Sequence, residues 1–218
     1  MIDARLLPVQ RRALRPLAAR LAAAGIGADR ITVAGFLIGL AAVACLAAGL
    51  PLAALALILV NRLADGLDGA VARLTRPTRR GAFLDIALDF VFYALVPLGF
   101  ALADPAANAL PAAVLIAAFV GSGSSFLAFA AVAAEAGIAT PRYAGKGIAY
   151  LGGLTEGFET IAVFCAMCLF PALFPALAYG FAAACALTML ARWRQGWLSF
   201  AADPTPAPDA EPNTDALP

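Results

Sequence analysis

The feature that most constrains this fold is a series of long apolar runs. Six runs follow one another along the chain: 31–50, 52–72, 83–102, 110–133, 147–169 and 173–190. A helix of about 20 apolar residues is long enough to cross the hydrocarbon core of a bilayer. The chain is 63% hydrophobic and 13% charged, whereas soluble domains are about 45–50% apolar and about 25% charged. We therefore expect the fold class to be an all-α integral membrane protein with six transmembrane helices.

The basic residues predict how these spans are oriented. Of the 15 Lys and Arg residues, all but Arg62 lie before the first span, in or beside the second or fourth loop, or after the sixth span. Because Lys and Arg concentrate on the cytoplasmic side of membrane proteins, we expect both termini and the second loop to face the cytoplasm. Arg62 lies inside the second span, and we expect it to pair with a nearby acid.

The N-terminal residues 1–30 are basic, with leucines at helical spacing: Leu14, Leu17 and Leu21. This pattern predicts an amphipathic helix on the membrane surface, with Pro8 and Pro16 breaking or starting its turns. A cleaved signal peptide is disfavoured, because the charged region and the apolar core are both too long. Asp29 is expected to be the N-cap of the first span, with Thr32 three residues further on.

Composition divides the chain into three parts. The segment 1–30 is the predicted surface helix, 31–195 is the six-span domain, and 196–218 is rich in Pro, Ala and Asp without periodicity. We expect this last segment to be a disordered tail. The net charge of +1 implies no general attraction to nucleic acid.

The cysteines do not predict a zinc site. Cys165 and Cys168 form a C-x-x-C pair, but the chain has no second pair and no histidine. Structural zinc needs four ligands, so buried apolar cysteines are the better interpretation. Without histidine, proton transfer would use a carboxylate, lysine, tyrosine or water.

Four carboxylates lie inside or at the edge of the second and third spans: Asp65, Asp68, Asp85 and Asp89. The first two are three residues apart and the last two are four apart, so each pair shares one helix face. The two pairs flank a basic loop centred near Pro77. If this loop closes a helical hairpin, the four acids meet at matched depths.

Such a cluster predicts bound metal. Each carboxylate inside a membrane span costs about 2.5–3.5 kcal/mol, and neighbouring carboxylates resist joint ionisation. A network of ion pairs is disfavoured because too few bases lie nearby. Carboxylates without thiol or imidazole suit Mg²⁺ or Mn²⁺. Two ions about 3.5–4 Å apart are typical where phosphoryl groups move.

Two glycines accompany the acids. Gly69 follows Asp68 directly, and Gly81 precedes Asp85 by one turn. Their missing side chains would let a flat ligand approach the backbone. Close helix packing, which small residues commonly allow in membranes, is the alternative explanation.

The segment resembles the signature of the CDP-alcohol phosphotransferase family, D-x-x-D-G-x-x-A-R followed by a spacer and G-x-x-x-D-x-x-x-D. Every signature position is filled: Asp65, Asp68, Gly69, Ala72, Arg73, Gly81, Asp85 and Asp89. The six-span layout extends the similarity over most of the chain. One departure is Ala28-Asp29 at the start of the first span, where many members have Pro-Asn.

The resemblance implies a membrane transferase of phospholipid synthesis. Members move a phosphatidyl or related substituted phosphoryl group from a CDP-linked donor, such as CDP-diacylglycerol, to an alcohol, and release CMP. Asp65, Asp68 and Asp85 would hold two Mg²⁺ or Mn²⁺ ions, with Asp89 contributing and also serving as the base. A CDP pocket would use these residues: Asp65, Asp68, Gly69, Ala72, Arg73, Gly81 and Asp85. The resemblance also implies a homodimer in the inner (cytoplasmic) membrane, among bilayer lipids, with its site facing the cytoplasm.

The fifth span holds the remaining candidate site residues. Thr155, Glu156 and Glu159 lie within it, and Arg142 and Lys146 lie at its mouth. Acids inside a span default to a functional hypothesis, and the two bases suit an acceptor phosphate. Hydrogen-bonded helix contacts and ordinary loop cations are the alternative. The acceptor stays open among inositol phosphate, glycerol phosphate, serine, choline and a lipid alcohol.

Two other functions compete with the transferase. A divalent-cation transporter would also use intramembrane acids. However, it needs polar groups across the whole membrane, and the outer halves of these spans carry almost none. A non-catalytic binder of the nucleotide-linked lipid would bind the donor without releasing CMP.

Overall fold

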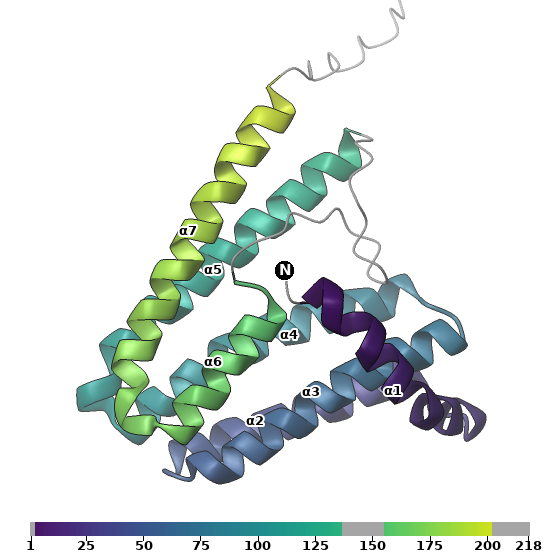
Figure 1. The fold of residues 1–218 in the computed structure, drawn as a ribbon, viewed down its shortest axis with the longest axis horizontal. Coiled ribbons are helices and arrows are strands. Elements are labelled where there is room, and N and C mark those ends of the chain that lie inside the picture. The colour runs from purple at the N-terminus through teal and green to yellow at the C-terminus, as the bar shows by residue number, and fades with distance from the viewer. Residues whose placement is uncertain (1–2, 137–154, 202–218) are drawn as a thin grey trace, which may run out of the picture.

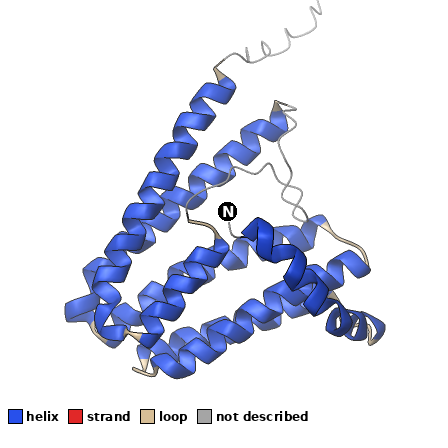
Figure 2. Cartoon of the chain, in the orientation of Figure 1, coloured by secondary structure: helices blue, strands red, loops and turns tan. Residues whose placement is uncertain are grey.

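The computed structural model describes residues 3–136 and 155–201 of the chain (Figure 1). These residues form the helices α1 (Asp3–Ala23), α2 (Ala28–Ala47), α3 (Pro51–Leu74), α4 (Arg79–Ala103), α5 (Pro105–Glu135), α6 (Gly157–Leu169), the 3₁₀ helix η1 (Pro171–Leu173) and α7 (Phe174–Phe200). The described chain contains no strand, which confirms the all-α fold class (Figure 2). Of the predicted tail 196–218, residues 196–200 belong to α7, and 202–218 lie outside the described residues.

Within the described residues, four segments are long and apolar enough to cross a membrane, namely α2, α4, α5 and η1 with α7. Helix α3 has 24 residues, but three charged side chains, Arg62, Asp65 and Asp68, interrupt its apolar sequence. Helix α6 has only 13 residues, and positions 147–154 of the predicted fifth span lie outside the described chain. The count of six spans therefore stays a prediction.

The core is built on aromatic side chains from three helices. Phe92 and Tyr93 of α4, Phe119 of α5 and Phe164 of α6 lie with ring centroids 6.1 to 6.4 Å apart. Four of the ring contacts join different helices. Three of these four are edge-on, an arrangement that aromatic pairs favour. This cluster fixes the middle of α4, the helix that carries Asp85 and Asp89.

Helix α2 approaches α3 and α4 closely because it carries glycines at the contacts. A Cβ atom at Gly39 would lie 2.8 Å from Cδ2 of Phe92 and 3.1 Å from Nδ2 of Asn61. A Cβ atom at Gly35 would lie 2.8 Å from Cβ of Ala64. Both distances to carbon are shorter than side-chain contacts allow, so these two glycines set the spacing of the helices.

The predicted hairpin around Pro77 is confirmed. Helix α3 ends at Leu74 and α4 begins at Arg79. The Thr78 side chain caps α4, because its Oγ1 accepts a hydrogen bond from the Gly81 backbone N–H at 3.0 Å. The short loop joins the two acid-bearing helices, and α2 packs against both of them.

The prediction that Asp29 caps the first span is wrong. Helix α2 begins at Ala28, its N-cap is Gly27, and Asp29 falls in its first turn. The Asp29 carboxylate instead binds Arg80 of α4, with Oδ2 2.6 Å from Nη2. Asp29 therefore forms an ion pair between α2 and α4 instead of capping α2.

Helix α1 differs from its prediction in two ways. It runs unbroken through Pro8 and Pro16, so these residues neither break nor start it. A proline removes one hydrogen bond of the ladder, and Pro16 lies on the exposed side of the helix. In addition, the fully buried Ala18 packs with Leu67 and Val71 of α3, so one apolar face of α1 meets protein rather than lipid.

Helix α7 continues to Phe200, ten residues past the predicted end of the sixth span. Arg192, expected outside the membrane span, is therefore part of the helix and is buried. Its Nη1 donates to the Ser122 carbonyl oxygen at 3.0 Å, and its guanidinium lies 5.6 Å from the centre of the Phe126 ring. This contact ties α7 to α5, which run side by side in Figure 1.

The glycine spacing can be tested with two matched substitutions. Gly39→Ala should destabilise the protein by about 1–3 kcal/mol, because the added methyl group overlaps Phe92. Gly180→Ala in α7 should be neutral or stabilising by up to about 1 kcal/mol, because open space surrounds that position. Thermal unfolding in detergent would measure both. Equal responses of the two variants would contradict the packing role of Gly39.

Candidate metal and phosphate site

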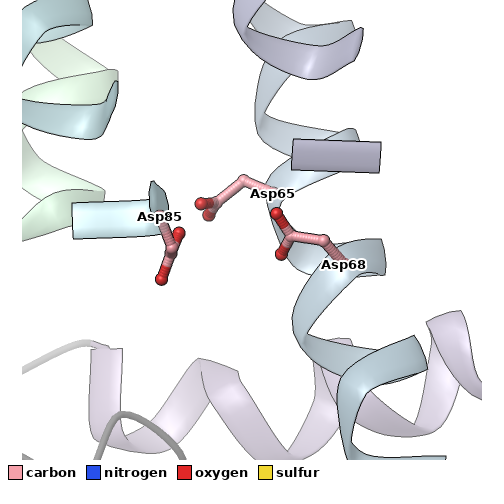
Figure 3. A group of neighbouring side chains, drawn as sticks. All are labelled: Asp65, Asp68 and Asp85. Carbon is pink, nitrogen blue, oxygen red and sulfur yellow. The ribbon is translucent and has the colours of Figure 1, made fainter. Parts of the chain in front are cut away.

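The α3–α4 hairpin brings three of the four predicted acids together. One carboxylate oxygen from each of Asp65, Asp68 and Asp85 can be chosen so that all three lie within 4.8 Å of one another. Asp65 and Asp68 project from α3, and Asp85 faces them from α4 (Figure 3). We call these residues the three-acid group. Its geometry follows from the helical spacing and the short loop.

The most buried member of the three-acid group is Asp68, whose exposed fraction is 5%. Its Oδ2 accepts a hydrogen bond from Thr32 Oγ1 of α2 at 2.6 Å. Hydrogen bonds to a charged acceptor are short and about twice as strong as neutral ones. Thr32 therefore holds the Asp68 carboxylate toward the other two acids.

The fourth acid, Asp89, is held by an arginine. Arg62 Nη2 lies 3.0 Å from Asp89 Oδ1, and Arg62 Nη1 lies 3.8 Å from Asp65 Oδ2. The prediction that Arg62 pairs with an acid of the cluster is thus confirmed. Asp89 lies at the same cleft as the three-acid group, but Arg62 is its ion-pair partner.

A buried asparagine supports this arginine. Arg62 Nε donates to Asn61 Oδ1 at 2.8 Å, and Asn61 Nδ2 donates to the Gly35 carbonyl oxygen of α2 at 2.8 Å. Asn61 is only 3% exposed. Three helices therefore contribute to the cleft, whose polar lining consists of Thr32, Asn61, Arg62, Asp65, Asp68, Asp85 and Asp89.

The two signature glycines differ in their surroundings. A Cβ atom at Gly69 would meet only the flexible end of Arg73, 3.2 Å from its Nη1. A Cβ atom at Gly81 would lie 3.0 Å from Asp29 Oδ1 and 3.2 Å from Thr78 Oγ1. Close helix packing, which explains Gly35 and Gly39, therefore does not explain Gly69, whereas Asp29 of α2 closely approaches Gly81. Room for a ligand at the backbone remains as the interpretation of Gly69.

The donor set fits a hard divalent cation. The three-acid group offers only carboxylate oxygens, which suit Mg²⁺ and Mn²⁺. Like charges this close repel, and Arg62, whose Nη1 lies 3.8 Å from Asp65 Oδ2, offsets only part of that repulsion. A bound cation would offset the rest.

Three of the predicted acceptor residues have structural roles at the start of α6. Glu156 and Glu159 form a capping box, in which the Glu156 backbone N–H donates to Glu159 Oε2 at 3.2 Å. Thr155 Oγ1 donates to Thr188 Oγ1 of α7 at 3.1 Å. Arg142 and Lys146 lie outside the described residues. The acceptor role of all five stays a prediction.

Sequence reasoning missed two contributors, Thr32 and Asn61. Thr32 was noted only for its distance from Asp29, and Asn61 was not singled out. Both are polar residues inside otherwise apolar runs, and Asn61 directly precedes Arg62. That signal was available, because polar side chains inside a membrane span need partners. The identity of the partners depends on how α2 packs and was not available.

The described residues thus form an all-α fold with several helices long and apolar enough to cross a membrane, and with a group of three acids that could hold a metal ion. The chain belongs to the CDP-alcohol phosphatidyltransferase family, whose sequence profile matches residues 26–195. Over 200 residues it is 52% identical to the inner membrane protein YnjF of Escherichia coli strain K12, covering 92% of this chain and 97% of that protein.

Another relative is the archaetidylinositol phosphate synthase of Methanothermobacter thermautotrophicus. The two are 43% identical over 93 residues, which is 42% of this chain and 46% of that protein. The similarity thus covers less than half of either chain.

Two solved structures share the fold. Both are of phosphatidylinositol phosphate synthase from Mycobacterium tuberculosis. The one with CDP-DAG bound aligns with a TM-score of 0.67 at 23% identity, covering 90% of this chain and 100% of the other. The one in complex with manganese and citrate aligns with a TM-score of 0.64 at 24% identity, covering 84% and 88%.

The contact between Thr32 and Asp68 generates a prediction for metal binding. Thr32→Val keeps the shape of the side chain and removes the hydroxyl that orients Asp68, so Mn²⁺ affinity should fall by about tenfold. Thr32→Ser keeps a hydroxyl and should bind Mn²⁺ nearly as well as the wild type. Mn²⁺ titration followed by electron paramagnetic resonance would measure both. If the valine variant binds Mn²⁺ as tightly as the wild type, Thr32 does not support the site.

Proposed function

We propose that the protein transfers a phosphatidyl group, or a similar substituted phosphoryl group, from CDP-diacylglycerol or a related CDP-linked lipid to an alcohol, with release of CMP. Membership of the family supports a transferase of phospholipid synthesis. The observation that carries the proposal is the three-acid group, since its members are signature acids that the fold brings together. A solved relative of the same fold is described with CDP-DAG bound.

Asp65, Asp68 and Asp85 would hold Mg²⁺ or Mn²⁺. When bound, such an ion neutralises charge on the donor pyrophosphate and on the departing CMP. The carboxylate-only donor set supports this assignment, as does the manganese complex of a relative that shares the fold. Thr32 of α2 orients Asp68, and α2 packs against both acid-bearing helices. The prediction of two ions, with Asp89 contributing, is retained in this proposal.

Asp89 is the proposed base. It would accept the proton of the acceptor hydroxyl as that oxygen forms a bond to the phosphorus carrying the lipid. The bond from this phosphorus to the bridging oxygen then breaks, and CMP leaves with the electron pair. Asp89 is suited to this role by its place beside the three-acid group, and the chain contains no histidine to take the proton.

The proposed CDP pocket lies along the same hairpin. Gly69, Ala72, Arg73 and Gly81 would line it, together with Asp65, Asp68 and Asp85. Arg73 is exposed and reaches over Gly69, so its guanidinium is available to a phosphate. Since only the movable end of Arg73 covers Gly69, the nucleotide could lie against the backbone of α3 once that side chain moves.

We further propose that the protein acts in the inner (cytoplasmic) membrane as a multi-pass homodimer, with its site facing the cytoplasm. The name of the relative YnjF as an inner membrane protein supports this location. The six-span domain of residues 31–195, with a surface helix before it and a tail after it, is the layout that the positive residues favour. Thr155, Glu156, Glu159, Arg142 and Lys146 remain proposed acceptor contacts, with the glutamates also capping α6.

The reaction can be tested directly on the purified protein. With Mn²⁺ or Mg²⁺ and CDP-diacylglycerol, CMP should be released only when a suitable alcohol is present, and mass spectrometry of the lipid product would identify that alcohol. Asp89→Asn should lower turnover by at least about a hundredfold while the protein remains folded, because the base is lost but the shape is kept.

Two results would contradict this function. No CMP release with any alcohol of a broad panel would leave only donor binding. Metal flux into proteoliposomes that lack substrate would favour the transporter. Normal turnover by Asp89→Asn would remove the proposed base but not the transferase.

The CDP pocket generates a separate prediction at Gly69. Gly69→Ala should raise the KM for the CDP-linked donor by about tenfold, because a methyl group would occupy space meant for the nucleotide. Its unfolding temperature should not fall, since the new methyl group meets only the movable end of Arg73. Steady-state kinetics and thermal unfolding together test this. A large loss of stability with an unchanged KM would indicate a packing role instead.

A further inference from the structure

Arg62 occupies an unusual place for an arginine in an apolar helix. It stands between two acids of the cleft, with Nη2 3.0 Å from Asp89 Oδ1 and Nη1 3.8 Å from Asp65 Oδ2. Its side chain is only 16% exposed. The family signature begins at Asp65 and does not include this position, so none of the proposed roles above accounts for it.

The surroundings of Arg62 hold its guanidinium in one place. Nε donates to the buried Asn61 side chain at 2.8 Å, and Nη1 lies 3.4 Å from the Tyr93 hydroxyl oxygen. The guanidinium carbon also lies 5.0 Å from the centre of the Phe92 ring and 5.6 Å from that of Tyr93. Two aromatic faces and fixed hydrogen-bond partners are typical of a guanidinium with a defined orientation.

Arg62 and a bound metal ion would serve some of the same carboxylates. Asp65 belongs to the three-acid group and also lies beside Arg62. Two cations that share one acid repel each other, and burial weakens the screening of that repulsion by water. The arginine therefore stabilises the acids when no ion is bound and competes with the ion when it binds.

We propose that Arg62 is a resident cation of the site with two consequences. It weakens the affinity of the three-acid group for divalent metal, and as a positioning residue it holds Asp89 in the orientation needed for turnover. The second consequence rests on the proposed function, whereas the first does not. Removing the positive charge should therefore tighten metal binding and slow the reaction at the same time.

The metal affinity is the decisive measurement. Arg62→Gln in the full-length protein should bind Mn²⁺ at least about tenfold more tightly than the wild type, as measured by electron paramagnetic resonance titration. Arg62→Lys keeps the charge and should remain close to the wild type. Arg76→Gln is the matched control, since it removes an exposed cation from the same hairpin and should leave the affinity unchanged. Unchanged or weaker Mn²⁺ binding by Arg62→Gln would overturn the proposal.

A second comparison covers the case in which Arg62→Gln does not fold, since removing one partner of a buried pair is costly. Asp89→Asn and the double variant Arg62→Gln/Asp89→Asn differ only in the arginine. In the double variant, no Asp89 carboxylate is left buried without its cation. The double variant should bind Mn²⁺ more tightly than Asp89→Asn. Equal or weaker binding would overturn the proposal in this background.

The kinetic test separates this proposal from the proposed function. At saturating Mn²⁺, Arg62→Gln should lower kcat by at least about tenfold while the KM of the CDP-linked donor changes little, and Arg62→Lys should restore part of the loss. An unchanged kcat would overturn the positioning role. If the wild type releases no CMP at all, the transferase proposal fails, while the Mn²⁺ affinities still decide whether Arg62 is a resident cation.

Discussion

The rest of this structure depends on the cost of placing ionised carboxylates inside apolar helices. Asp68 is almost fully buried, and Asp65 and Asp85 lie close enough to share one cation. Their mutual repulsion has to be offset within the protein or by a ligand. Arg62 supplies a fixed positive charge beside them. The carboxylates and Arg62 therefore determine the electrostatics of the cleft. This arrangement of charges is compatible with binding a metal ion and a pyrophosphate.

Small residues in α2 make this balance geometrically possible. Gly39 admits both Phe92 and Asn61, which are the residues that support the Arg62 guanidinium. The carbonyl oxygen of Gly35 accepts the hydrogen bond that orients Asn61. The packing of α2 against α3 and α4 is thus coupled to the electrostatics of the cleft. The same contacts stabilise the fold and set the geometry of the site. A methyl group at Gly39 would therefore also disturb the positions of the acids.

The N-terminal helix belongs to the same assembly. A Cβ atom at Gly66, between the acids of α3, would lie 2.6 Å from the Gln10 side chain and 2.7 Å from that of Leu14. Helix α1 therefore covers the outer side of the segment that carries Asp65. Near the start of α4, the ion pair of Asp29 with Arg80 joins α2 to the hairpin at Gly81. These contacts fix the loop that the signature residues flank.

The sequence by itself determined the helical class, the hairpin around Pro77 and the pairing of Arg62 with an acid, because apolar length and helical spacing are local properties. Only the tertiary structure decided that Asp89 pairs with Arg62 apart from the three-acid group, and that Thr32 and Asn61 support the cleft. It also placed Arg192 inside α7, with its guanidinium buried against α5. These outcomes depend on contacts between helices distant in sequence, which spacing along one helix does not encode.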